Sequence, residues 1–332
     1  MNRQEISGRA RVTGAVMALR SDTGWQIVSP TVAQAPHLLA GVAVASPTEV
    51  WVTGHVEQHP LIARWDGTTW TNAPAPPPDP SHIGAGFQGI AAAPGRAIAV
   101  GGAYDRVAGT EVPLIQHWNG TSWERADPDT DGYVLTDVTF IGEEAWAVGH
   151  GLPWGGPSGP VALHWSANTW RPASLPSITK GKLLAVSGTA PDDLWAVGAA
   201  DRAGLIMHYD GHTWTRVPSP TTRFPLSDVV ALSPSEAWAV GRDRVLHWNG
   251  RKWSNTKTPV TAANTITART PDDLWVAGGG GELAHYDGQR WTLTTSPQPP
   301  GETAVWLASA AQDGGIWIVG SIDGFSRAAL LA

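Results

Sequence analysis

Short runs of apolar and small residues, punctuated by glycine and proline, extend along the whole chain. No stretch keeps the period of 3.6 residues that marks an amphipathic helix, so these runs predict strands. One run recurs seven times as a hydrophobic–Trp–hydrophobic–small–Gly sequence, here called the first block. Its copies span 50–54, 97–101, 145–149, 194–198, 237–241, 274–278 and 316–320, and the second has Ile98 in place of Trp.

A second block follows each of the first six copies and ends in Trp. Its copies span 64–70, 117–123, 164–170, 208–214, 247–253 and 285–291. Most contain Asp-Gly or Asn-Gly, dipeptides that suit tight hairpin turns because they tolerate positive φ. Each unit therefore reads as four short strands with fixed turns and loops of variable length.

Repeats of four strands every 40–50 residues or so predict a β-propeller. Seven first blocks predict seven blades, but the last blade has no second block after it. The segment 20–25, which ends in Trp25, resembles the missing block. We therefore expect an all-β, seven-bladed β-propeller with four antiparallel strands per blade, forming a single domain over 1–332. The N-terminal segment 12–30 should complete the last blade with 303–332, where 328–332 reads as a further strand.

Composition narrows the range of functions. The chain has 332 residues, no Cys and a net charge of −7. The absence of Cys excludes disulfides and thiol catalysis, and the lack of a basic stripe argues against nucleic acid or an anionic membrane as partner. The N-terminal sequence lacks the layout of a signal peptide, and no apolar run reaches membrane-spanning length. We expect a cytoplasmic monomer.

Most of the 19 Trp residues belong to the repeat, so they are expected to pack between blades. Trp154 and Trp306 lie outside it, and Trp154, in a Gly/Pro-rich loop, is a candidate for stacking on a ligand. Five His residues occupy equivalent positions on different blades and cannot converge on one site. They are expected to hydrogen-bond each outer hairpin to its neighbour, and they are His117, His164, His208, His247 and His285.

The second block resembles the Asp-box of bacterial-neuraminidase-type repeats, Ser-x-Asp-x-Gly-x-Thr-Trp. The segments 66–70 and 210–214 match its core, with Arg64 or His208 in place of the Ser. The unit is also similar to the Trp-rich repeats of bacterial propellers and, more loosely, to the fucose-binding propeller lectins. This resemblance implies the scaffold only, because no sialidase catalytic residue maps onto the chain.

The loops between second and third strands, and those between blades, differ from unit to unit, and such loops surround one mouth of a propeller channel. Divergence on one face favours that face for function. His beside Asp and Arg suits acid–base chemistry on a polar or anionic molecule. The predicted catalytic residues are His55, His150, Asp137, Asp228 and Arg242. The predicted binding residues are Glu57, His59, Gln88, Asp105, Arg106, Trp154, Arg202 and Arg244.

Three functions remain open at this point. The first is one central site that binds and transforms a small polar or anionic molecule, as a non-redox lyase, hydrolase or cyclase would. The second is a carbohydrate-binding lectin with sites between blades, and the third is a protein-interaction scaffold. His55, His59 and His150 with Asp137 lack the spacing of a metal site, so neither metal nor cofactor is expected.

Overall fold

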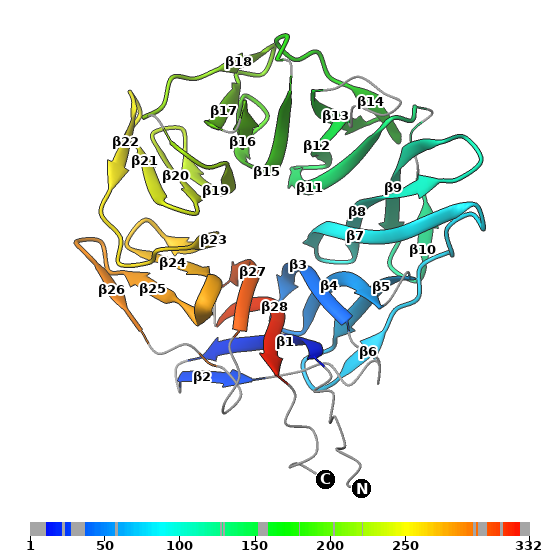
Figure 1. The fold of residues 1–332 in the computed structure, drawn as a ribbon, viewed down its shortest axis with the longest axis horizontal. Helices are drawn as coiled ribbons and strands as arrows, with labels where there is room; N and C mark the ends of the chain where they lie inside the picture. The colour runs from blue at the N-terminus through cyan, green and yellow to red at the C-terminus, as the bar shows by residue number, and fades with distance from the viewer. Residues whose placement is uncertain are drawn as a thin grey trace, which may run out of the picture.

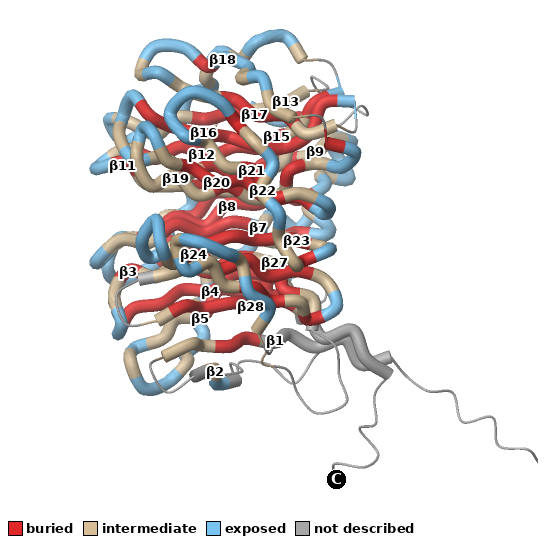
Figure 2. Tube along the Cα trace, turned by 90° about the vertical axis from the view of Figure 1, so that its left-hand side faces the viewer, coloured by how far each residue is buried: buried red, intermediate tan, exposed pale blue. Residues whose placement is uncertain are grey.

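The computed structural model describes residues 11–21, 24–27, 37–56, 59–126, 128, 130–151, 159–178, 180–201, 203–220, 222–294, 297, 304–312 and 315–325. Seven four-stranded antiparallel sheets stand around a central axis (Figure 1). The predicted seven-bladed β-propeller is confirmed. Buried residues form a band through the middle of the ring, and exposed residues gather at its turns and loops (Figure 2).

Each of the first three blades runs in chain order from its inner to its outer strand. Blade one is β3 (His37–Ser46), β4 (Glu49–Val56), β5 (His59–Trp65) and β6 (Trp70–Asn72). Blade two is β7 (His82–Ala93), β8 (Arg96–Asp105), β9 (Thr110–Trp118) and β10 (Trp123–Arg125). Blade three is β11 (Tyr133–Ile141), β12 (Glu144–Gly151), β13 (Pro160–Ser166) and β14 (Thr169–Pro172).

The next three blades follow the same order. Blade four is β15 (Gly181–Ala190), β16 (Asp193–Ala200), β17 (Ala203–Tyr209) and β18 (Trp214–Arg216). Blade five is β19 (Leu226–Ser233), β20 (Glu236–Gly241), β21 (Arg244–Trp248) and β22 (Trp253–Thr256). Blade six is β23 (Ala263–Thr270), β24 (Asp273–Gly278), β25 (Leu283–Tyr286) and β26 (Trp291–Leu293), with the short 3-10 turn η1 (Gly279–Gly281) after β24.

Blade seven joins the two ends of the chain. Its inner strands are β27 (Ala304–Gln312) and β28 (Gly315–Phe325), and its outer strands are β1 (Arg11–Ser21) and β2 (Gly24–Ile27). β1 pairs antiparallel with β28 from Arg11 opposite Phe325 to Arg20 opposite Ile316 (Figure 1). The predicted strand at 328–332 lies outside the described residues, and β1 takes the third position of the blade. The ring therefore closes by hydrogen bonds between N-terminal and C-terminal strands.

The ring has two different faces. On the turn face, tight turns join the first strand of a blade to the second and the third to the fourth. At Asp66, one carboxylate oxygen accepts hydrogen bonds from the Thr68 and Thr69 amides at 2.8 and 2.7 Å, while Gly67 has a φ of 98°. Asn119, Asp210, Asn249 and Asp287 cap equivalent turns. On the loop face lie the connections between second and third strands and between blades, which differ in length.

Each first-block Trp packs against aromatic rings of the following blade. The ring centroid of Trp195 lies 4.9 Å from that of Trp248 and 5.1 Å from that of Trp253. The contact recurs between the last blade and the first, where the ring centroid of Trp317 lies 5.7 Å from that of Trp70. The predicted packing of Trp between blades is therefore confirmed, and it continues from blade seven to blade one.

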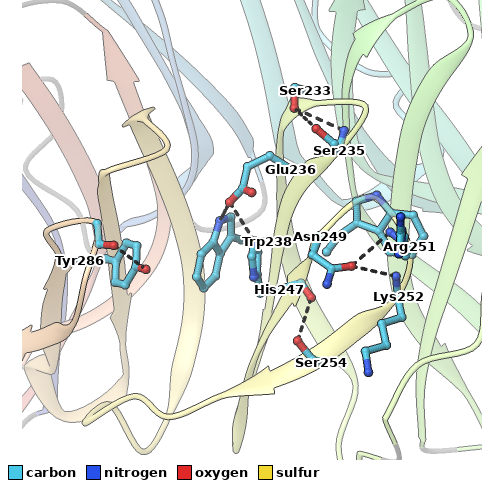
Figure 3. A network of polar contacts seen from close by, with 12 residues as sticks. Ser233, Ser235, Glu236, Trp238, His247, Asn249, Arg251, Lys252, Ser254 and Tyr286 are labelled. Carbon is cyan, nitrogen blue, oxygen red and sulfur yellow. Dashed lines mark hydrogen bonds and ion pairs between the residues drawn. The ribbon is translucent and has the colours of Figure 1, made fainter.

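The repeated His residues act mainly within their own blade. In blade five, the Glu236 carboxylate accepts hydrogen bonds from Trp238 Nε1 at 2.7 Å and His247 Nε2 at 2.9 Å (Figure 3). The His247 ring also stacks on Trp238, with centroids 4.2 Å apart. His164, His208 and His285 pair with the corresponding acids of their blades. These units hold the second and third strands of a blade together at the turn face.

Blade two departs from this pattern because Ile98 replaces the first-block Trp and no acid precedes it. His117 there accepts a hydrogen bond from Trp170 Nε1 of blade three at 3.0 Å. Its ring contacts Trp165 and Trp170 in the place that a Trp would occupy. Burial lowers the pKa of His117 to about 4. This His alone among the five connects neighbouring blades through its hydrogen bond, within the described residues.

Candidate functional site

The central channel holds a cavity of about 270 Å³ that all seven inner strands line. Each inner strand carries one extra residue at the same level, which its partner strand does not match. These bulge residues are Ala40, Gln88, Thr136, Leu184, Ser227, Asn264 and Leu307. A bulge bends the strand and redirects its side chains, and here the redirected residues line the channel.

The glycine that ends each first block makes the bulge possible. A Cβ on Gly149 would lie 2.0 Å from the Val134 carbonyl oxygen, and one on Gly198 would lie 2.0 Å from that of Lys182. The inner strand thus approaches its neighbour where only glycine leaves room. The Gly that ends each first block in the sequence is therefore the residue that allows the bulge in the neighbouring inner strand.

Three polar bulge residues connect neighbouring blades. Thr136 Oγ1 donates to the Leu183 carbonyl at 3.0 Å, and Asn264 Nδ2 donates to the Trp306 carbonyl at 3.0 Å. Ser227 Oγ lies 3.5 Å from the equivalent carbonyl, that of Ala263. Contacts between neighbouring blades therefore fix the positions of these three polar side chains in the channel.

Two predicted acids follow directly after bulge residues and reach into the next blade. Asp137 of blade three accepts a hydrogen bond from the Val186 amide of blade four at 2.8 Å. Asp228 of blade five accepts hydrogen bonds from the Ile266 amide at 2.9 Å and Thr265 Oγ1 at 2.8 Å, both in blade six. Val186 and Ile266 occupy equivalent positions, so the two carboxylates make the same contact on different blades.

Both carboxyl groups are deep in the channel, yet their residues keep some accessible surface toward the cavity. Burial, with a smaller contribution from the charge of Asp228, raises the pKa of Asp137 to about 7. Burial likewise raises the pKa of Asp228 to about 6. Among the described residues that line the cavity, these two are the only ionisable ones. The cavity is accordingly acidic and polar, and it disfavours an anion.

Gln88 is the third predicted residue in the channel lining, where it lies exposed on β7. The other described candidates lie on the loop face outside the lining: His55, His59, Asp105, Arg106, His150, Arg242 and Arg244. Only the innermost strand of a blade borders the axis, whereas these residues lie at or beside ends of second and third strands. The structure does not bring His55, His150 and Arg242 together with Asp137. Glu57, Trp154 and Arg202 lie outside the described residues.

Several of the outer candidates have local partners. Arg242 stacks over the Phe224 ring, 5.3 Å from its centroid. Asp105 accepts hydrogen bonds from the amides of 107 and 108, and these bonds hold its pKa below the ordinary range. Arg244 Nε lies 3.5 Å from an Asp243 carboxylate oxygen. These residues order the loops of the rim.

His150, at the end of β12, is the outer candidate in the most unusual environment. Burial lowers its pKa, and the positive charge of Lys182 lowers it further. Its Nδ1 is buried and has no hydrogen-bond partner among the described residues. His150 is therefore held neutral near the rim, away from the channel lining.

The sequence interpretation missed the residues that hold the two acids in place. Thr265 bonds Asp228 and also lies 2.7 Å from Ser309 Oγ, and Thr136 and Asn264 connect blades. Their signal was a polar residue at the bulge position of four of the seven inner strands, or at the position that directly follows the bulge, where Asp137 and Asp228 stand in their own strands. In the parts of the chain that the structure describes, no group of three or more His, Asp or Glu side chains can hold a metal ion.

No protein-family model and no curated protein matches the sequence. Solved structures with the same fold do match. YCF48 bound to D1 peptide has a TM-score of 0.60 at 14% identity, over 91% of this chain and 95% of that one. Virginiamycin B lyase from Staphylococcus aureus has a TM-score of 0.62 at 14% identity, over 92% and 99%. The WD40 β-propeller domain of Doa1 has a TM-score of 0.63 at 9% identity, over 91% and 97%.

These likenesses establish the class, a seven-bladed β-propeller, and at such identities they establish the fold alone. The Asp-box resemblance is not supported by any family match. The similar structures include an assembly with a peptide, a lyase and a WD40 domain, so the scaffold serves unlike functions. Within the described ranges, the chain forms no helix of the length and apolarity that a membrane span requires.

Proposed function

We propose that the protein is a binding module that takes the cationic group of a ligand, an ammonium or guanidinium, into its central channel. One observation carries this proposal: Asp137 and Asp228 are the only ionisable side chains among the described residues lining a cavity of about 270 Å³. The loop face admits the ligand, and the rest of the ligand lies on the divergent loops.

The polar side chains around the two acids suit a cationic ligand. Hydroxyls of Thr136, Ser187 and Ser309, with the Gln88 carboxamide, add neutral hydrogen-bonding groups around the two acids. A cation bound near two carboxyl groups of raised pKa favours their ionised form, so it relieves the burial penalty that raises those pKa values. A buried charge pair is stable only when such further hydrogen bonds are available.

The two other readings of the sequence are less well supported. Catalysis by His55, His150 and Arg242 on an anion needs these groups beside Asp137, and they lie outside the cavity lining. A lectin with sites between blades needs free Trp faces there. The described repeat Trp rings are instead engaged with rings of the neighbouring blade, as Trp195 is with Trp248 and Trp253.

Calorimetric titration with small probes tests the channel directly. Arginine amide is the cationic probe, with glycerol and acetate as neutral and anionic probes. Asp137→Asn and Asp228→Asn keep an oxygen that accepts the blade-to-blade hydrogen bond but remove the charge. Asp131→Asn is the matched control, since Asp131 is an exposed acid on the loop face.

The proposal predicts that wild type binds arginine amide in preference to the other two probes. Each channel variant should weaken binding by about tenfold, the typical effect of removing one charged hydrogen-bonding partner. Asp131→Asn should bind as wild type does. Equal binding by the channel variants, or stronger binding of acetate than of arginine amide, would refute the proposal.

A second candidate function, binding of a protein segment, is favoured by one specific surface. Blade two extends past its neighbours at the loop face and exposes Ile83, Tyr104 and Val107, at 40%, 38% and 86% of their surface. Ile83 and Tyr104 are paired across β7 and β8, so these side chains lie close together. Exposed apolar clusters of this kind mark interaction sites. A solved structure of similar fold, YCF48, has a peptide bound.

Selection of binding peptides from a random display library tests this second candidate. Peptides enriched on wild type should lose binding to a Tyr104→Ser/Val107→Ser variant and keep binding to Leu293→Ser. Leu293 is an exposed apolar residue of blade six, 55% accessible, and serves as the control. Enriched peptides that bind both variants as well as wild type would exclude the blade-two surface.

A further inference from the structure

A second cavity, of about 180 Å³, lies at the closure of the ring, where blades six and seven meet at the turn face. It is lined by Arg20, Ser21, Arg269 and Ile316 and is called here the seam pocket. Arg20 and Ser21 end β1, Arg269 lies near the end of β23, and Ile316 lies near the start of β28.

Arg20 breaks the repeat at a position where every other blade has an aromatic residue. It pairs with Ile316 of the second strand, as Trp248 pairs with Ala237 and Tyr286 with Leu274. The six aromatic equivalents are Trp65, Trp118, Trp165, Tyr209, Trp248 and Tyr286. In blade seven a guanidinium therefore stands where an indole or phenol ring would fill the space between blades.

The Arg20 guanidinium is held in place by the ring of the preceding blade. Its central carbon lies 4.6 Å from the ring centroid of Trp275, a cation–π contact in place of the ring–ring contact of other blades. Among the described residues, no carboxylate lies within ion-pair distance of Arg20. In the described ranges, no acid engages the N–H groups at the edge of this stacked guanidinium.

Arg269 also departs from the repeat. It is the extra residue of a second bulge, near the turn end of β23, where Ala45, Thr189 and Leu232 are the equivalents in other blades. It forms an ion pair with Asp273, which also accepts hydrogen bonds from Trp275 Nε1 and His285 Nε2 at 2.9 Å each.

Asp273 is an acid beside the seam pocket, in the part of the chain that the structure describes. Burial alone would raise the pKa of Asp273, but the hydrogen bonds from Arg269, His285 and Trp275 outweigh it and leave that pKa lowered. The carboxylate is therefore ionised and already has three donors. Among the described side chains at the pocket, this carboxylate lies with two guanidinium groups, and these three groups together carry one positive charge.

We propose that the seam pocket binds a phosphate-type oxyanion, with Arg20 as its principal ligand. A planar guanidinium offers two parallel N–H donors that match two oxygens of such a group. Two independent substitutions in the repeat, at 20 and 269, converge on this one pocket. The site lies on the opposite face from the proposed cation site, and neither depends on the other.

The test is a calorimetric titration of inorganic phosphate at constant ionic strength into the full chain and three variants. Arg20→Gln removes the charge, and Arg20→Trp restores the aromatic residue that six blades have. Arg251→Gln is the matched control, because Arg251 is an exposed arginine on the turn face of blade five. Circular dichroism and the thermal midpoint establish that each variant is folded.

Wild type and Arg251→Gln should bind one phosphate per chain with affinities within about twofold of each other. Both Arg20 variants should bind it about tenfold more weakly or not at all, as expected when a charged hydrogen-bond donor is removed. Because Arg20→Trp preserves the packing on Trp275, its loss of binding cannot be assigned to a damaged seam. Absence of saturable binding, unchanged binding in Arg20→Trp, or an equal loss in Arg251→Gln would overturn the proposal.

Discussion

Replacing Asp137 by Asn should stabilise the fold at neutral pH and leave it nearly unchanged at acidic pH. The native carboxyl group binds its proton more tightly than the unfolded chain does, since burial raises its pKa from 3.8 to about 7. Stability from this group is therefore present below about pH 4 and is lost as the pH rises toward 7. The amide of Asn carries no charge and can still accept the hydrogen bond from the Val186 amide.

The size of the effect follows from the shift in pKa. A rise from 3.8 to about 7 is three units, and at about 1.4 kcal/mol per unit the ceiling is about 4 kcal/mol. Accessible surface toward the channel lets water reach the charge, so the realised gain should be on the order of 1–2 kcal/mol. Asp228→Asn should show the same behaviour over a narrower range, from about pH 4 to 6.

Urea unfolding followed by circular dichroism at pH 4 and pH 8 measures this effect. We expect the difference in unfolding free energy between variant and wild type to be close to zero at pH 4 and positive at pH 8. Asp131→Asn, on the exposed loop face, should show no such change. A variant that is less stable than wild type by the same amount at both pH values would refute the reasoning. It would mean that the carboxylate stabilises the ring in a way that an amide cannot.

Three further predictions address the ring. Trp195→Ala should lower the unfolding free energy by about 3–5 kcal/mol in urea titrations, whereas an equal loss in exposed Leu293→Ala would contradict the packing account. NMR titration should find His117 neutral down to about pH 5. The stability that neutral His117 contributes should be lost as the pH falls from about 6.5 through 4, because the unfolded chain then binds the proton more tightly. Protonation of His117 above pH 6 would be inconsistent with its buried contact to Trp170. Deletion of 1–27 removes β1 and β2 and exposes the edge of β28. Size-exclusion chromatography of this variant should therefore find aggregates. A folded monomer would show that the ring does not need the N-terminal strands.

The architecture was predictable because the blades repeat the same two sequence blocks. The first-block Trp and Gly of 194–198 mark a second strand, and the Asp-Gly turn at 210–211 marks the outer hairpin. Spacing between blocks then separates strands from loops. The segment 12–30 was expected to complete blade seven, and 328–332 was expected to be a further strand from its apolar residues alone. The pairing of β1 with β28 shows that β1 is the third strand.

The candidate site was predictable only in part. Asp137 and Asp228 stood out as acids at the start of predicted first strands, and the structure places each directly after a bulge residue that lines the channel. His55 and His150 lie on second strands, which do not border the axis, so loop divergence alone overestimated their closeness to it. Arg20 was not singled out from the sequence, because the segment 20–25 was taken as a whole for the missing second block. Its position became clear only from the structure, in which the N-terminal strand β1 places Arg20 over Trp275 of blade six.

The channel is tested most directly by a crystal structure of the protein soaked with a bromine-labelled alkylamine, located by its anomalous signal. We predict one peak inside the channel, with the ammonium group within hydrogen-bond distance of the Asp137 and Asp228 carboxylates, and its loss in the Asp137→Asn/Asp228→Asn double variant. An amine bound only elsewhere, or one that stays in the channel of the double variant, would contradict the account.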